Sequence, residues 1–452
     1  MGRSPSAALG VDKLLPNGND MTLALALLAI FAIMAVLMYL NRLPAIVALP
    51  IMAIVIALVA RVPWADLANI VSEGAFKLHV AYTTAILGAV LAGIVSKTGV
   101  AETMVKKTAE LGGDRPILLA LLMTAVIALL FTTLGGLGAV IMVATIVFPV
   151  LLALGMPQLT VGCLFLFGMS LGGVLNVVNW QVYKSVLEVP QNTIISFAFP
   201  MAGLMALATV VFAVVQLRPA RLRRYWAAPE PERPVKFAPW YSLLTPIVPL
   251  LPVLGFGLYN IIGKPAKPFD FPIITAMMIG IAYGLIASPR PAQGRIQLLV
   301  RSVMEGIGGV APAIALMLGI GMLIQAVQHP KVLGQIQPLL SAILPSTRLG
   351  YVVVFTVLAP LALYRGPLNV WGMGFGLAQM MAAAPGLSPA AVMAALLSVG
   401  QLQGVSDPTN THNVWIANYV GVDVQRVLRA TLPYVWGAGA AGLVVGAVLF
   451  MR

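Results

Sequence analysis

The sequence between residues 132 and 189 contains TTLGGLGAVIM (132–142) and GGVLNVVNWQVYKSVLEV (172–189), and a similar pair recurs later in the chain. There, residues 364–374 read YRGPLNVWGMG and residues 402–423 read LQGVSDPTNTHNVWIANYVGVD. Four positions match at a constant separation of 231 residues, about half the chain: Gly135 with Gly366, Gly173 with Gly404, Asn176 with Asp407 and Asn179 with Asn410. These polar interruptions of apolar sequence decide the predicted fold.

The composition places almost the whole chain in a lipid bilayer. Of its 452 residues, 60% are hydrophobic and 9% are charged, and the mean hydropathy is +0.97. Soluble domains carry about 25% charged residues, so little of this chain can form a soluble domain. The formal net charge of +13 comes from basic residues in short loops between apolar segments. That distribution follows the positive-inside rule and does not indicate a nucleic-acid partner.

The pattern predicts an all-α polytopic membrane protein with two inverted repeats. Each repeat is expected to contain one re-entrant hairpin and one broken transmembrane helix. We expect about 10 to 11 spans in addition to the hairpins. The predicted parts are an N-terminal tail (1–20), the first repeat (21–217), a basic and proline-rich linker (218–239) and the second repeat (240–452). A membrane protein of this kind is typically a secondary transporter.

The basic residues orient the chain. Five full spans precede the linker if the first hairpin returns to its own side, so the linker and the N-terminus lie on opposite sides. Lys97, Arg115 and Arg426 fall on the same side as the linker, which predicts that this side is the cytoplasm. We therefore expect a multi-pass protein of the bacterial inner membrane, with the two hairpins entering from opposite faces.

The hairpin tips and helix breaks hold the residues that we expect to bind a substrate. A broken helix exposes backbone N–H groups and the positive end of a helix dipole, which favour anions. Glycine lets the backbone approach a ligand, and hydroxyl and amide groups can bond carboxylate oxygens. The predicted substrate-binding residues are Thr132, Thr133, Gly135, Gly136, Asn176, Asn179, Arg365, Asn369, Thr409 and Asn410. This set suits a small polar anion held mostly by neutral donors.

Arg365 is the most informative charged residue, because it follows a long and almost wholly apolar run. A charge at membrane depth costs at least ~2.5–3.5 kcal/mol on insertion scales. A substrate carboxylate would offset this cost through a bidentate contact. A structural pair with Asp407, or a position at the membrane interface, would also account for it.

Asp407 is the predicted coupling-ion residue, with Ser406 and His412 beside it. A desolvated carboxylate can carry a proton, and a segment rich in oxygen donors can bind sodium. The alternative is that Asp407 caps the half-helix that follows it. We predict no cofactor other than a possible sodium ion, and no metal site, since Cys163 is the single cysteine.

Residues Gly168 to Gly172 read GMSLG and match the G-x-S-x-G motif of hydrolases. That motif requires a turn from a strand into a helix, whereas this one lies in an apolar helix. An intramembrane serine protease with Ser170 as nucleophile is therefore an alternative, while small residues at this spacing are also typical of close helix packing. The sequence contains no H-E-x-x-H motif and no P-loop, so we predict no enzyme and no catalytic residue.

Two runs resemble a known family. Residues 155–180, GMP…GGVLNVVNW, resemble the first broken span of the citrate–metal symporter (CitMHS-type) family, and residues 407–426, DPTN…ANYVGVD…R, resemble the second. Residues 84–150 also resemble gluconate permeases. Both families belong to the ion transporter superfamily, and the resemblance covers most of residues 80–218 and 345–450.

The resemblance implies a homodimer, with a scaffold domain and an elevator-type transport domain that holds both hairpins and both broken spans. It also implies uptake of organic anions driven by protons or sodium. Metal–citrate symporters are acid-rich at the first tip, where this chain has TTLGGLG, so we expect an uncomplexed carboxylate such as citrate, a dicarboxylate or a hydroxy acid. The alternative within the superfamily is a sodium/proton antiporter or an inorganic-anion exporter.

Overall fold

The computed structural model describes residues 18–40, 42–113, 115–217, 237–289, 294–384 and 386–451. All regular structure in these residues is helical. Most of the predicted N-terminal tail and most of the predicted linker lie outside the described residues. The helical content agrees with the predicted all-α fold class.

The helices before the linker are α1 (Gly18–Tyr39), α2 (Ala45–Val59), α3 (Trp64–Phe76), α4 (His79–Lys97), α5 (Val100–Gly112), α6 (Pro116–Phe131), α7 (Leu137–Ala153), α8 (Gln158–Val174), α9 (Val177–Leu187) and α10 (Gln191–Gln216). The elements after it are η3 (Trp240–Leu244), α11 (Leu250–Gly263), α12 (Ile273–Ala287), α13 (Arg295–Gln328), α14 (Pro330–Ile343), α15 (Arg348–Leu358), η4 (Ala359–Ala362), η5 (Val370–Gly374), α16 (Phe375–Ala383), α17 (Pro389–Ser406), α18 (Thr411–Tyr419) and α19 (Val424–Phe450).

Proline marks the start of several helices. Pro44, Pro63, Pro157 and Pro190 each stand directly before a helix. Proline cannot donate a backbone hydrogen bond, and the first N–H groups of a helix have no partner within it, so proline costs little at this point. The prolines therefore divide the apolar chain into separate helices.

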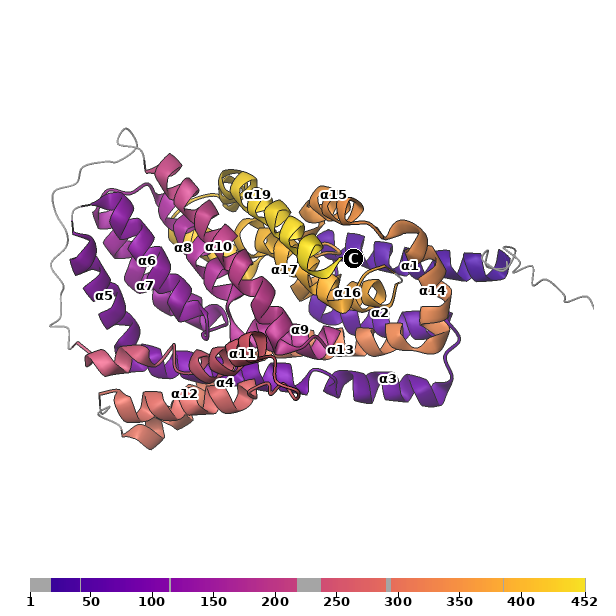
Figure 1. Cartoon of the computed structure of the whole chain (residues 1–452), viewed down its shortest axis with the longest axis horizontal. Helices are drawn as coiled ribbons and strands as arrows, with labels where there is room; N and C mark the ends of the chain where they lie inside the picture. Colours follow the sequence, from indigo (N-terminus) through magenta and orange to yellow (C-terminus); the bar gives the residue numbers. More distant parts are fainter. Residues whose placement is uncertain are drawn as a thin grey trace, which may run out of the picture.

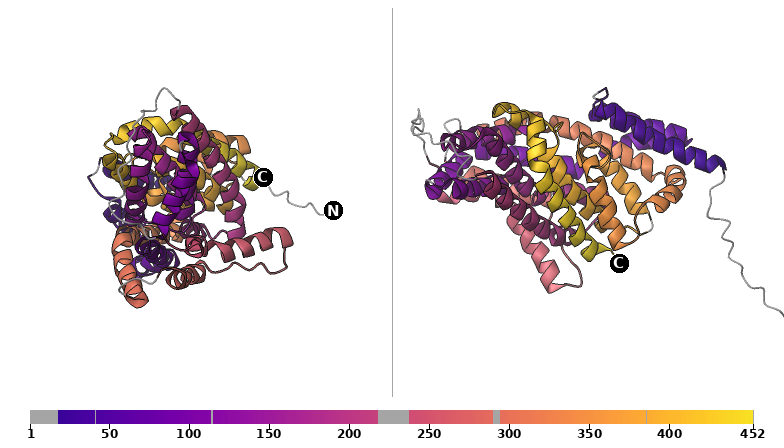
Figure 2. Two further views of the ribbon diagram at one scale, coloured as in Figure 1. Left: turned by 90° about the vertical axis from the view of Figure 1, so that its left-hand side faces the viewer. Right: turned by 90° about the horizontal axis from the view of Figure 1, so that it is seen from above.

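Long helices form one layer of the molecule, along the lower side of Figure 1. Helix α13 packs along α2, α3 and α4. Gly74 of α3 lies against Met322, whereas Gly93 of α4 lies against Ser302, so α13 runs antiparallel to α3 and α4. Small residues allow this close approach. Figure 2 shows α1 and α2, in indigo, at the side of this layer.

A second group of helices forms a bundle on this layer (Figure 1). In it, α6 packs against α8, α17 against α19, and α10 against both α8 and α19. The bundle contains both predicted hairpins, α6–α7 and α15–α16, and both predicted breaks, α8–α9 and α17–α18. The break between α8 and α9 bends the chain by 51°.

A two-fold relation connects the two halves of the bundle. Ser170 of α8 donates to Oε1 of Gln401 in α17 at 2.7 Å, and these residues are 231 positions apart, the repeat distance of the sequence. Equivalent positions meet in this way where a two-fold axis passes between them. Near the start of α8, Gly162 lies against Ile416 and Val420, which come after Gln401 in the chain. The two broken helices therefore run antiparallel, as inverted repeats require.

Several elements lie outside the predicted hairpins and breaks. Helices α3 and α14 have 13 and 14 residues, whereas α13 has 34 residues and begins at Arg295. The second repeat begins with η3 and then α11, which do not form one continuous helix. Pro246 and Pro249 fall between these two elements and cannot donate helical hydrogen bonds.

Helix lengths limit the number of membrane spans. In the described part of the chain, five helices are long and apolar enough to cross a membrane, or six if the bent pair α8–α9 counts as one span. The hairpin legs and several other apolar helices are shorter. The expected 10 to 11 spans therefore stay a prediction.

Candidate functional site

Asn176 holds the tip of the first hairpin against the first break. It caps α9 and is 5% exposed. Its Oδ1 accepts hydrogen bonds from the backbone N–H groups of Val178 (2.8 Å) and Asn179 (3.1 Å). Its Nδ2 donates to the carbonyl oxygens of Phe131 (2.7 Å) and Leu134 (3.0 Å). The bonding capacity of this amide is therefore used within the chain.

The two threonines of the first tip are also bonded internally. Thr132 Oγ1 donates to the Leu129 carbonyl at 2.6 Å, and the Thr132 carbonyl accepts from the Val177 N–H at 3.1 Å. Thr133 Oγ1 donates to the Pro246 carbonyl at 2.8 Å, which ties the tip to the chain between η3 and α11. Each hydroxyl already donates its one hydrogen to a backbone carbonyl. Substrate binding by these threonines therefore stays a prediction.

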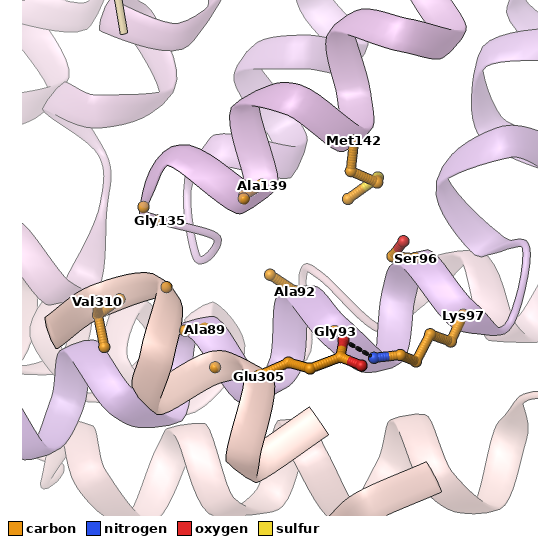
Figure 3. Close-up of a pocket in the computed structure, with 14 residues that line it drawn as sticks. Ala89, Ala92, Gly93, Ser96, Lys97, Gly135, Ala139, Met142, Glu305 and Val310 are labelled. Atoms are coloured by element: carbon orange, nitrogen blue, oxygen red, sulfur yellow. Dashed lines mark hydrogen bonds and ion pairs between the residues drawn. The ribbon is translucent and has the colours of Figure 1, made fainter. Parts of the chain in front are cut away.

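Glycines of the first tip line a cavity of about 180 Å³ between the hairpin, α4 and α13. A side-chain carbon at Gly135 would meet nothing within 4 Å. Gly136 has a φ of 84° and lies beside Val310 of α13. Figure 3 shows the opposite wall, where Lys97 and Glu305 form an ion pair. The backbone of this tip therefore faces open space.

Asp407 occupies the equivalent position at the second break and is fully buried. Its Oδ1 accepts hydrogen bonds from the Tyr364 N–H (3.0 Å), the Thr409 N–H (2.9 Å) and Thr409 Oγ1 (2.7 Å). Its Oδ2 accepts from Asn369 Nδ2 at 3.3 Å. Asp407 thus ties the second tip to the second break through neutral donors alone.

Arg365 lies in the second tip without a carboxylate partner. Its Nη2 donates to the Thr409 carbonyl at 3.4 Å. Among the ion pairs of the described residues, none includes Arg365. The pair with Asp407 that the sequence left open is therefore not formed in this structure.

The backbone of the second tip is strained. Tyr364 has a φ of 53° and Arg365 a φ of 59°, in the left-handed region that favours glycine. Such residues cost of order 1–3 kcal/mol each and persist where the surroundings impose them. The hydrogen bond from the Tyr364 N–H to Asp407 provides such a restraint.

Two buried amide oxygens beside Asp407 have no hydrogen-bond partner. They are Oδ1 of Asn369 and Oδ1 of Asn413, and each residue is 1% exposed. Asn413 Nδ2 donates to the Asp407 backbone carbonyl at 2.9 Å. An unsatisfied buried oxygen costs about 1–3 kcal/mol, which a bound cation would relieve. We did not predict Asn413, and its place in the polar segment after Asp407 was the available signal.

The remaining predicted residues of the second half have local partners. Ser406 Oγ and Thr431 Oγ1 lie 2.8 Å apart. Asn410 Oδ1 caps α18 by accepting from the His412 N–H at 3.1 Å. Asn410 and Asn179 donate backward across their breaks, to the carbonyls of Gln403 (3.2 Å) and Gly173 (2.9 Å). These contacts give the amides of Asn179 and Asn410 a structural role. None of these hydrogen bonds tests the predicted role of His412 in ion coupling.

Ser170 donates its hydroxyl proton to Gln401, whose amide cannot act as a general base. Gly168 and Gly172 lie in close contact with Thr124 and Ala128 of helix α6. The G-x-S-x-G match therefore coincides with close helix packing, and the geometry gives no support to a nucleophilic serine.

One solved structure establishes the fold class. The transporter YdaH of Alcanivorax borkumensis, whose crystal structure has an unusual topology, is similar to this chain with a TM-score of 0.58 and 16% sequence identity. The match covers 84% of this chain and 86% of that chain. No protein-family model and no curated protein sequence matches the chain. The chain therefore has an all-α polytopic membrane fold like that of this transporter, and these comparisons do not show its family.

Proposed function

We propose that the protein is a cation-coupled symporter of small organic carboxylates, such as citrate, dicarboxylates or hydroxy acids. Arg365 carries the proposal, because its guanidinium lies at the second tip without a carboxylate partner among the described residues. A carboxylate would bond two N–H groups of the guanidinium fork and offset its charge. The transporter fold of the chain supports the same interpretation.

Sodium is the coupling ion that the second break favours. The fully buried carboxylate of Asp407 bonds to Asn369 and its backbone carbonyl to Asn413, and both of these amides keep an unbonded oxygen. Hard cations take oxygen ligands, and transporters coordinate sodium where helices unwind. A proton carried by Asp407 is the alternative that the experiment below separates.

We further propose elevator-type alternating access by a homodimer in the bacterial inner membrane. The layer of α2, α3, α4 and α13 and the bundle that holds both hairpins are two distinct groups of helices (Figure 1). This arrangement supports two parts that move relative to one another. The basic residues that gather in loops on one side, among them Lys97, Arg115 and Arg426, support the orientation.

Uptake into proteoliposomes tests the function. Labelled citrate, succinate and gluconate are offered under an imposed sodium gradient and then under an imposed proton gradient. We expect at least one of them to accumulate under the sodium gradient. Arg365→Lys should raise KM about ten- to hundredfold, since lysine keeps the charge but lacks the planar fork, and Arg365→Ala should do worse.

Arg348→Lys is the matched control. Arg348 lies in the same hairpin at the start of α15 and donates to the Met451 carbonyl at 3.0 Å, away from the tip. It should transport like the wild type. Wild-type KM in a folded Arg365→Ala protein would refute the substrate contact, and accumulation under the proton gradient alone would assign the coupling to protons.

A further inference from the structure

A second polar pocket of about 370 Å³ lies at the junction of α3 and α4, far from the tip cavity along the same helices. Its polar lining comes from three segments: Asp66, Asn69, Lys77, Gln325, Gln328 and His329. No sequence motif marks this pocket, because its members come together only when α13 packs antiparallel to α3 and α4.

Lys77 is half-buried in this pocket and is bonded to amides alone. Its Nζ donates to Oε1 of Gln328 and, at 3.4 Å, to Oε1 of Gln325. Lys97, Lys106 and Lys184 are similarly shielded, and each forms an ion pair with a carboxylate. Within the described chain no carboxylate forms such a pair with Lys77, so its charge is not neutralised by direct contact.

Neither of the two acidic residues near Lys77 forms an ion pair with it. Asp66 lies 3.4 Å from Nε2 of His329, which is its ion-pair partner when the imidazole is protonated. Glu188 acts on Lys77 only through space. The pocket therefore offers the Lys77 ammonium group, the Asp66–His329 pair and several amide groups whose N–H ends can turn toward an anion.

The pocket is connected to the second hairpin. Gln328, which accepts from Lys77, donates from Nε2 to Oε1 of Gln379 in α16 at 2.8 Å. Helix α16 is the second leg of the hairpin that carries Arg365. A ligand that takes the place of Gln328 at Lys77 would thus also alter a contact between α13 and this hairpin.

The pocket and the tip cavity lie at opposite ends of helix α4. Helix α4 has 19 residues, with Lys77 just before it and Lys97 at its end. At 1.5 Å per residue α4 is about 28 Å long, close to the ~30 Å of a bilayer core. The candidate membrane span, Trp64–Lys97, is longer than α4 and contains Lys77, so the two lysines lie about one bilayer core apart along it.

We infer that the pocket around Lys77 is a second binding site for the transported carboxylate, which holds the anion at the end of α4 away from Lys97 before it reaches Arg365. This inference rests on the proposed carboxylate transport. The anion replaces the amide oxygens of Gln325 and Gln328 at the Lys77 ammonium, and the released amides turn their N–H groups toward it.

Uptake kinetics in proteoliposomes test the site, with labelled citrate and succinate as probes. Lys77→Gln should raise KM about tenfold or more and leave the maximal rate unchanged, because glutamine can keep the amide contacts but not the charge. Lys77→Arg should keep the wild-type KM. Lys106→Gln is the matched control, since Lys106 pairs with Glu102 on α5, and it should have no effect. Wild-type KM in Lys77→Gln would overturn the inference and leave the proposed function intact.

Equilibrium dialysis of the purified full-length protein separates the two sites. Arg365→Ala should retain residual succinate binding, and adding Lys77→Gln should remove it. Equal binding by the single and double variants would overturn the second site. If the wild type binds and transports neither probe, the proposed carboxylate function fails and the inference fails with it.

A measurement on the wild-type chain does not depend on variant folding. Succinate should slow acylation of Lys77 by an amine-reactive reagent, relative to Lys106, as measured by mass spectrometry of peptides. Equal slowing of both lysines, or of neither, would show that succinate does not occupy the pocket.

Discussion

Asn176 and Asp407 stand at equivalent positions of the two repeats, yet they bond to their hairpin tips with opposite polarity. Asn176 donates from Nδ2 to two carbonyls of the first tip, whereas Asp407 accepts an N–H group from the backbone of the second. Each Oδ1 also accepts the N–H group two residues on, from Val178 or Thr409. The fold thus requires, at this position, a side chain that hydrogen-bonds the hairpin tip to the helix break. A donor toward the tip fills this role in the first repeat, and an acceptor fills it in the second.

The difference between the tips lies in what else they carry. At the 231-residue spacing, Leu134 of the first tip corresponds to Arg365 and Gly138 to Asn369. Leu134 is buried and apolar, and Gly138 faces open space. The second tip instead holds the Arg365 guanidinium, whose Nη2 bonds only to a backbone carbonyl in the hydrogen bonds of the described residues. It also holds Oδ1 of Asn369, a buried amide oxygen without a hydrogen-bond partner. Shared contacts therefore build the fold, and the unshared polar groups mark where a ligand is expected.

Asn176→Asp is the sharpest test of the comparison and has the largest expected effect. A carboxylate at this position would face the carbonyl oxygens of Phe131 and Leu134, which need donors. We expect a loss of about 3 kcal/mol in the free energy of unfolding, since two bonds are lost and a charge is buried unpaired. Thermal unfolding in detergent measures it. Wild-type stability would show that the two positions are interchangeable, contrary to their opposite polarity.

The reciprocal change, Asp407→Asn, should spare the fold and affect coupling. Oδ1 can keep the contacts from Tyr364 and Thr409, and only the new Nδ2 faces the Asn369 amide. We expect a stability loss of about 1 kcal/mol, together with loss of concentrative uptake under a sodium gradient and retention of exchange.

Asp423→Asn controls for the capping role. Asp423 caps α19 by accepting from the Gln425 N–H at 2.9 Å, and asparagine caps about as well as aspartate. This variant should accumulate substrate normally. Concentrative uptake by Asp407→Asn at the wild-type level would leave Asp407 as a cap without a coupling role.

The sequence predicted more of the fold than of the site. The 231-residue spacing located both breaks and both tips, because glycine, proline and asparagine gather inside an apolar run where a membrane helix is interrupted. It could not show that Thr133 bonds to Pro246, more than a hundred positions away, since such contacts depend on packing. The Lys77 pocket escaped prediction for the same reason. Arg365 was identifiable in advance because a charge in apolar sequence is costly wherever the chain places it.

Two neighbouring glycines of the first tip allow a further comparison, with smaller expected losses of stability. Gly136→Ala should lose about 1 kcal/mol, because its φ of 84° is unfavourable for alanine and Val310 lies close to the new methyl group. Gly135→Ala should change stability little, since its methyl group meets open space. Thermal unfolding of both variants checks the difference. Equal losses would contradict the open cavity at Gly135.

Ser170→Ala has a small expected effect on stability and none on transport, and it tests the position where the two repeats meet. The change removes the hydroxyl that donates to Gln401 and leaves the amide oxygen without that donor. A neutral buried bond of this kind contributes about 1 kcal/mol, so unfolding should occur at a slightly lower temperature while KM and maximal uptake rate stay at wild-type values. Ser170→Thr, which keeps a hydroxyl, should recover part of the stability. A serine nucleophile predicts the opposite, namely complete loss of activity in a stably folded Ser170→Ala protein. That outcome would rule out a purely packing role for the G-x-S-x-G segment, because packing at Gly168 and Gly172 does not depend on the hydroxyl group.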